Sequence, residues 1–154
     1  MSKFDTCMPD HELISPRDTA MWAAYHDIRR RVLFEARGRF GVYVENHPDE
    51  VHLDFHPKVL LWRGTPIGVV RIDLTGSVAI FRRVAIREDL QRQGHGRAMF
   101  RLGEDFARAH GCRELQSHVA RDAVEFYRKQ GFERAQSDSA EPKGSESVFM
   151  RKPL

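Results

Sequence analysis

Two short segments in the second half of the chain carry residues that could do chemistry. Residues 87–97 are polar and contain Gly94-His95-Gly96 just ahead of an apolar pattern with helical spacing. Amides at a helix start lack internal acceptors and carry partial positive charge, so glycines there would let a phosphate approach the backbone. The second segment contains Tyr127, a phenol that is protonated at neutral pH and can donate a proton. On the residue types alone, the first segment could be a phosphate-binding turn or a tight connection, and the second contains a side chain that can donate a proton but could also be a half-buried aromatic.

The glycine-rich turn matches neither of the common phosphate motifs. It lacks the third glycine of a dinucleotide fingerprint, and the chain has no GxxxxGK[ST] loop. A glycine-rich turn before a helix is also common as a simple tight connection. On the residues alone, both interpretations remain open.

The charge distribution around this turn is uneven. The chain has a formal net charge of +3, but residues 82–101 hold six arginines against two acidic residues, a local balance of +4. Such a stretch is either a solvated basic face or a site for a polyanionic ligand. Nucleic acid is the weaker explanation because no exposed aromatic residues are interleaved with the arginines.

The spacing of apolar residues predicts the helices that must position these two segments. Met21, Tyr25, Ile28 and Val32 predict a helix that Asp18 or Ser15-Pro16 can cap. The residues after Gly94 predict a second helix with an apolar stripe, and Asp122 is expected to cap a third that ends at Gly131. That stripe is expected at Met99, Leu102, Phe106 and Ala109, with Gly111 as the C-terminal cap.

Strands are expected at residues 58–63, 67–74, 78–86, 114–119 and 148–151, and the first three should form an antiparallel meander. Residues 1–15 are expected to be an irregular arm. The order of elements predicts a mixed α/β domain with an antiparallel half and a βαβ half. With 154 residues and 41% apolar content, residues 1–154 are expected to form a single domain.

Both chemical segments resemble one family. Gln91-Arg92-Gln93-Gly94-His95-Gly96 spells Q-x-x-G-x-G shortly after a V-A-I strand end, and residues 125–132 contain FYxxxGF. These motifs are similar to the acetyl-CoA signature and the following helix of the GNAT N-acetyltransferase superfamily. The resemblance covers roughly residues 17–152, including the IRRRV and VFMRK segments.

This resemblance implies a splayed, mainly antiparallel central sheet flanked by helices, with acetyl-CoA as cosubstrate. The backbone of residues 84–86 would face the pantetheine arm, and amides of residues 91–96 would hold the pyrophosphate. Two positions depart from the usual pattern: Gln91 stands where the family often has Arg, and Ala120 where many members have Asn. The cofactor-binding residues implied are Val84, Ala85, Ile86, Gln91, Arg92, Gln93, Gly94, His95, Gly96 and Arg97.

Tyr127 is the candidate general acid that would protonate the departing thiolate, and the resemblance favours this role over that of a half-buried aromatic. The general base is less defined. A histidine side chain can accept a proton near neutral pH, so His118 is a candidate, but a structural histidine is the favoured interpretation, and a chain of water molecules could replace the base. Glu141 and Glu146 lie in a polar loop and are expected to be solvated.

The sequence therefore predicts an N-acetyltransferase acting on a primary amine of a small molecule or protein. The alternative is a non-catalytic acyl-CoA sensor of the same fold. No membrane span or signal peptide is evident, so a cytoplasmic location is expected, and a homodimer is plausible by resemblance. No metal is expected: His47, His52 and His56 have metal-like spacing without a second cluster, and Cys112 is expected to be a small buried residue.

Overall fold

The computed structural model describes residues 10–48, 51–136 and 147–154. At its centre is a seven-stranded sheet with the order β1-β2-β3-β4-β5-β7-β6, antiparallel except for the β4–β5 pair. This confirms the predicted mixed α/β fold with a mainly antiparallel sheet. The strands are β1 (His11–Ile14), β2 (Phe55–Trp62), β3 (Thr65–Thr75), β4 (Val78–Ile86), β5 (Glu114–Ala120), β6 (Glu133–Arg134) and β7 (Ser147–Pro153).

Three α-helices flank the sheet. Helix α1 (Thr19–Ile28) begins where the Asp18 carboxylate accepts the Met21 amide at 2.8 Å, so Asp18 is the cap of the two that the sequence allowed. It continues through a π-helical turn η1 (Arg29–Phe34) and a 3₁₀ turn η2 (Glu35–Arg37). The other elements are η4 (Glu88–Leu90), α2 (His95–Ala109), η5 (Arg121–Ala123) and α3 (Val124–Lys129). Among the described residues, no helix is both long enough and apolar enough to cross a membrane.

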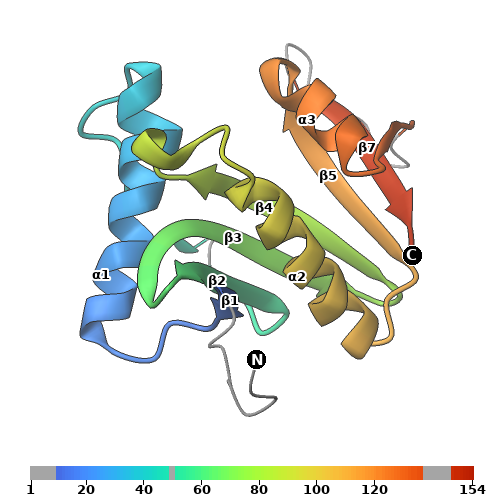
Figure 1. Ribbon diagram of the computed structural model, residues 1–154, viewed down its shortest axis with the longest axis horizontal. Coiled ribbons are helices and arrows are strands. Elements are labelled where there is room, and N and C mark those ends of the chain that lie inside the picture. The colour runs from blue at the N-terminus through green and yellow to red at the C-terminus, as the bar shows by residue number, and fades with distance from the viewer. Residues whose placement is uncertain (1–9, 49–50, 137–146) are drawn as a thin grey trace, which may run out of the picture.

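The helices cover opposite faces of the sheet. Neighbouring residues of a strand point to opposite faces, and β3 shows this at one step. Val70 packs in the cluster that contains Met99 of α2, whereas Val69 packs with Tyr25 of α1. We call these the α2 face and the α1 face; Figure 1 shows α2 crossing one side of β3 and β4.

The sheet opens between β4 and β5. These two strands pair only from Val78 to Ile80, against Glu114 to Gln116. Beyond that point β5 and β7 turn away from β4, as Figure 1 shows. The C-terminal half of β4 is therefore hydrogen-bonded to β3 on one edge, while its other edge has no ladder with β5.

A β-bulge lies in the half of β4 that pairs with β3 but not with β5. Val69 faces Ala85 and Arg71 faces Arg82, so two β4 residues oppose Val70. One of them, Arg83, has a φ of +56°, which is unfavourable for a residue with a side chain. Bulges bend a strand and redirect its side chains, and they recur beside active sites.

Three sequence expectations were wrong. Residues 11–14 are not irregular but pair with the edge of β2, a contact that only the folded sheet supplies. Asp122 does not cap α3, because it lies within η5 and Ala123 takes the cap position without a side-chain hydrogen bond. In α2, Met99, Leu102 and Phe106 face the core as expected, but Ala109 is exposed, and Gly103 and Ala107 are buried instead.

Candidate active site

The N-terminal end of α2 is open to an anion. Gly94 precedes the helix with a φ of +90°, and no side chain caps the helix there. The first intrahelical bond runs from the Ala98 amide to the Gly94 carbonyl, so the amides before it have no acceptor within the helix. A Cβ placed on Gly94 would project into space with no atom within 4 Å. This end of α2 therefore fits a phosphate held by backbone amides.

Polar side chains of the preceding turn stabilise its shape. Gln91 Nε2 donates to the Ile86 carbonyl at 2.9 Å, and Gln93 Nε2 donates to the Asp89 carbonyl at 3.3 Å. Arg87 makes two hydrogen bonds to the Asp89 carboxylate, at 3.2 and 2.8 Å. These three side chains are thus engaged within the turn itself.

Two arginines remain exposed beside the open helix end. Arg92 adopts a left-handed conformation with a φ of +62°, and Arg97 lies in the first turn of α2. Neither has a hydrogen bond to a described residue. Arg87 is already paired with Asp89, so Arg92 and Arg97 are the arginines of this segment best placed to meet a bound phosphate.

The His95 side chain and the missing side chain of Gly96 both serve packing. The His95 side chain is 5% exposed, with Nδ1 2.8 Å from His11 Nε2 and its ring 4.7 Å from the Trp62 ring. It can therefore offer a phosphate only its backbone amide. A Cβ on Gly96 would lie 3.0 Å from Phe126 Cζ, so this glycine allows α3 to pack closely against α2.

Tyr127 lies at the base of the opening between β4 and β5. Its side chain is almost fully buried, and Oη is 3.4 Å from Ser117 Oγ, which donates to the Phe81 carbonyl at 2.8 Å. Ser117 follows the last paired residue of β5, so its hydroxyl continues the β4–β5 connection where the ladder stops. Burial raises the pKa of Tyr127 to about 12, and the Ser117 hydrogen bond opposes this only in part. The phenol is therefore protonated at neutral pH.

His118 lies on the opposite side of β5 from the residues that face Tyr127. Successive strand residues alternate, and His118 is exposed while Ser117 and Val119 are buried. Its ring is 5.3 Å from the Phe149 ring of β7. The structure therefore places the two candidate catalytic residues on different faces of the sheet.

A buried charged group on β3 and β4 was missed by the sequence reasoning. Arg71 donates two hydrogen bonds to Asp73, each at 2.8 Å, and Arg82 Nε donates to the same carboxylate at 2.9 Å. The signal was present, since Arg71 and Asp73 occupy one face of an otherwise apolar strand. Ser117 was missed for the same reason, as a polar residue on the buried side of β5.

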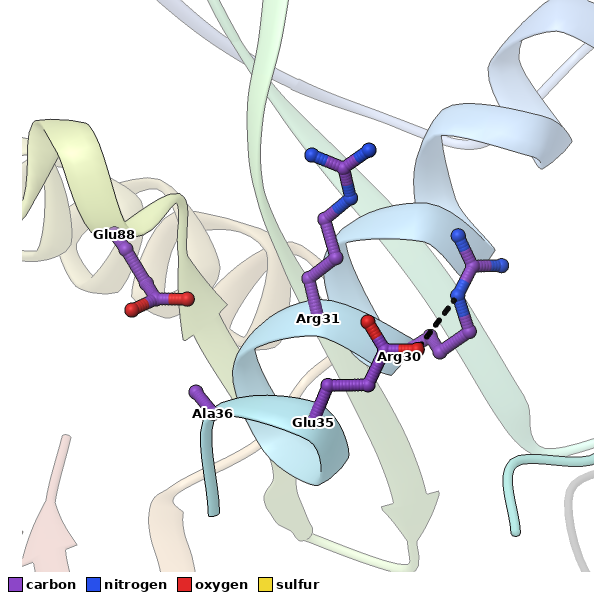
Figure 2. Close-up of a pocket in the computed structure, with 5 residues that line it drawn as sticks. All are labelled: Arg30, Arg31, Glu35, Ala36 and Glu88. Carbon is purple, nitrogen blue, oxygen red and sulfur yellow. Dashed lines mark ion pairs between the residues drawn. The ribbon is translucent and has the colours of Figure 1, made fainter. Parts of the chain in front are cut away.

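An open groove of ≈ 450 Å³ lies between the turns η1 and η2, which follow α1, and η4. In Figure 2 the Arg31 side chain extends away from both Glu35 and Glu88, while Arg30 Nε pairs with Glu35 at 3.5 Å. Its two arginines and two carboxylates balance, so the groove selects neither anions nor cations. We assign it no role.

The metal-like histidine pattern does not converge. His52 Nδ1 accepts the Asp54 amide, whereas His56 packs against Phe106 of α2. Within the described residues, no group of three or more potential ligands could hold a metal. Cys112 is buried, as expected, and burial raises its pKa. Glu141 and Glu146 lie outside the described residues.

Comparison with known proteins agrees with this geometry. No curated protein sequence matches the chain. A protein from Lactobacillus plantarum described as an N-acetyltransferase has a similar structure, with a TM-score of 0.76, 27% identity, and coverage of 94% of this chain and 98% of that one.

Two further solved structures share the fold. The ribosomal-protein-S18-alanine N-acetyltransferase of Escherichia coli has a TM-score of 0.70 at 20% identity, covering 93% of each chain. The PaiA N-acetyltransferase of Thermoplasma acidophilum, in complex with coenzyme A, has a TM-score of 0.70 at 16% identity, covering 94% of this chain and 99% of that one. Residues 18–132 match the Acetyltransferase (GNAT) family. The chain therefore belongs to the GNAT family of acetyltransferases.

Proposed function

We propose that the protein transfers an acetyl group from acetyl-CoA to a primary amine by direct attack in a ternary complex. One observation carries the proposal: the unpaired edge of β4 leads to the open N-terminus of α2, and the Tyr127 hydroxyl lies at the base of the same opening. A long thioester with a diphosphate at its far end matches both features.

Acetyl-CoA would lie along these two elements. The free edge of residues 84–86 offers backbone groups to the pantetheine arm, and the amides at the start of α2 offer donors to the diphosphate. The coenzyme A complex of the Thermoplasma PaiA protein supports the choice of cofactor. Of the residues expected to bind it, Gln93 and His95 would act through the backbone, because their side chains are engaged elsewhere. Gln91 would act by holding the turn, since its side chain bonds the Ile86 carbonyl and its amide bonds the Glu88 carbonyl.

The two faces of the sheet would serve the two halves of the reaction. The amine nitrogen attacks the thioester carbon, the C–S bond breaks, and the nitrogen loses one proton. Tyr127 would donate a hydrogen bond from the α2 face to the departing sulfur, which takes up one proton as coenzyme A leaves. The amine would approach from the α1 face, where His118 or water would accept its proton. The products are the N-acetylated amine and coenzyme A.

A homodimer is a further proposal. Exposed apolar side chains between α1 and β2 support it, since large apolar residues exposed together often mark an interface. Sedimentation analysis would report the oligomeric state. These side chains are Phe40, Val42, Val44, Val51 and Leu53.

Two glycine variants at opposite ends of α2 test the cofactor site. Gly94 and Gly111 have φ values of +90° and +79°, and each faces open space. Asp at either position imposes similar backbone strain, but only Gly94→Asp places a carboxylate at the proposed phosphate site. Calorimetry should show weaker coenzyme A binding for Gly94→Asp and near-normal binding for Gly111→Asp. Equal affinities in the two folded variants would refute the assignment.

A thiol-release assay with acetyl-CoA and a panel of primary amines tests the transfer itself. We expect coenzyme A to be released only when a suitable amine is present. Tight coenzyme A binding with no acceptor in a broad panel would instead favour the sensor. Absence of coenzyme A binding would overturn both.

A further inference from the structure

Arg71, Asp73 and Arg82 form a charged cluster on the α1 face of the sheet, and stable packing of the sheet does not require such a cluster. Arg71 and Arg82 are direct cross-strand neighbours on β3 and β4, and like charges in that position destabilise a sheet. Asp73 lies between them and binds both. Within the described part of the chain, one carboxylate is thus shared by two guanidinium groups at this point.

Asp73 orients Arg82 through one hydrogen bond and leaves the terminal nitrogens of its guanidinium free to bind a ligand. Asp73 and Arg71 are each 7% exposed at the side chain and joined by two hydrogen bonds, and the Arg71 guanidinium lies 3.9 Å from the centre of the Phe55 ring. This buried pair holds Arg82 through Nε alone. The Arg82 side chain is 38% exposed, and its terminal nitrogens make no hydrogen bond to a described residue.

Arg82 also lies at the same position along the β4–β5 opening as Tyr127, the candidate general acid. It follows Phe81, whose carbonyl accepts the Ser117 hydroxyl beside Tyr127. Since Arg82 binds Asp73 on the α1 face, Arg82 and Tyr127 lie on opposite faces of the sheet at the same depth of the opening. His118 of β5 also points to the α1 face, across the opening from Arg82.

We propose that Arg82 binds a carboxylate of the acceptor, so that the substrate class is a small primary amine that also carries a carboxylate. This rests on the proposed function, because it assigns the α1 face to the acceptor. Two terminal N–H groups held in a fixed plane match the two oxygens of a carboxylate. The Arg71–Asp73 pair is the positioning device, since it orients Arg82 without reaching the acceptor.

The first experiment does not depend on turnover. In protein saturated with coenzyme A, the arginine Nε–H signals are followed by ¹⁵N NMR, and the Arg82 signal is identified by its loss in Arg82→Lys. Adding 4-aminobutanoate should shift this signal, whereas n-butylamine should not. No shift at millimolar 4-aminobutanoate and longer ω-amino carboxylates would overturn the proposal, whether or not the enzyme is active.

The second experiment measures kcat/KM for ω-amino carboxylates and for n-alkylamines of equal chain length. The wild-type protein should prefer the carboxylates, and Arg82→Gln should lower their kcat/KM by roughly tenfold to a hundredfold, the range for a hydrogen bond to a charged group. The kcat/KM values for the alkylamines should change little in Arg82→Gln. Arg82→Lys should restore only part of the preference, because it lacks the planar fork.

Arg108→Gln is the matched control, since Arg108 is an exposed arginine on α2, away from this face. The kcat/KM values of Arg108→Gln for both classes of amine should equal those of the wild-type protein. A preference for carboxylates that persists in Arg82→Gln, or equal use of both classes by the wild-type protein, would overturn the proposal while leaving the acetyl transfer intact. Failure of coenzyme A binding would instead refute the proposed function.

Discussion

Replacing Tyr127 with Phe removes one hydroxyl from the base of the β4–β5 opening. The ring contacts remain, including those to Phe100 and Phe132 at 5.0 and 5.2 Å between centroids. Ser117 keeps its hydrogen bond to the Phe81 carbonyl, so no buried group is left without a partner. We therefore expect the variant to fold, with a loss of stability of about 1 kcal/mol from the missing hydrogen bond.

The catalytic effect follows from the raised pKa of Tyr127. Complete transfer of a proton from a phenol of pKa about 12 to a thiolate with a reference pKa near 8.5 is uphill by about 3.5 units, or roughly 5 kcal/mol. Tyr127 should therefore contribute mainly a hydrogen bond to the charge that develops on sulfur. Removal of one such donor in other buried sites costs about 10²- to 10³-fold in turnover. We expect a loss of that size in Tyr127→Phe, with acetyl-CoA affinity nearly unchanged.

Single-turnover measurements are the appropriate assay, because product release could mask the chemical step. The loss in Tyr127→Phe should be smaller for acyl donors whose thiol is more acidic, since that leaving group needs less help. The raised pKa also sets the pH dependence: Tyr127 stays neutral up to about pH 11, so the wild-type rate should show no decline from its ionisation below that pH. Wild-type turnover in Tyr127→Phe, or a tyrosine ionisation near pH 9 that abolishes activity, would refute the reasoning.

Two further predictions concern the support of the site and its charge. A Cβ at Gly103 would lie 2.7 Å from Cζ of the buried Phe81. Although alanine has the better helix propensity, this clash should make Gly103→Ala lower the free energy of unfolding by up to about 2 kcal/mol. A stabilised variant in urea denaturation would contradict this. Joint replacement of Arg92 and Arg97 by Gln should weaken coenzyme A binding by about 1 kcal/mol or less per residue and reduce its salt dependence. Arg87→Gln is the control, and an unchanged salt slope in the double variant would assign these arginines to the solvated surface.

Much of the fold could be predicted because its signals are local. Asp18 caps α1 through its own side chain, and the glycines at 94, 111 and 131 all have positive φ where helices begin or end. By contrast, β1 could not be predicted from its four residues. Its pairing depends on the edge of β2, which is distant in sequence.

The candidate site was predictable in its motifs but not in the use of each side chain. The Q-x-x-G-x-G segment located the turn, and the structure shows that Gln91 bonds the end of β4 while His95 packs inward. Sequence spacing cannot distinguish these uses, because they depend on what lies beneath the turn. Trp62 and His11 come from β2 and β1, and only the assembled sheet brings them under α2.

The bulge in β4 would let one strand contact both of the proposed substrates. Before it, Phe81 points to the α2 face and supplies the carbonyl that Ser117 binds. Arg82 then reaches Asp73 on the α1 face, and Arg83 lies 5.9 Å from the Phe34 ring of η1. The consecutive side chains of Arg82 and Arg83 thus both contact residues on the α1 side of the sheet, whereas in a regular strand they would point to opposite faces. The doubled arginine in V-A-I-F-R-R-V-A-I is the sequence signal of this break, since a regular strand would bury one of the two.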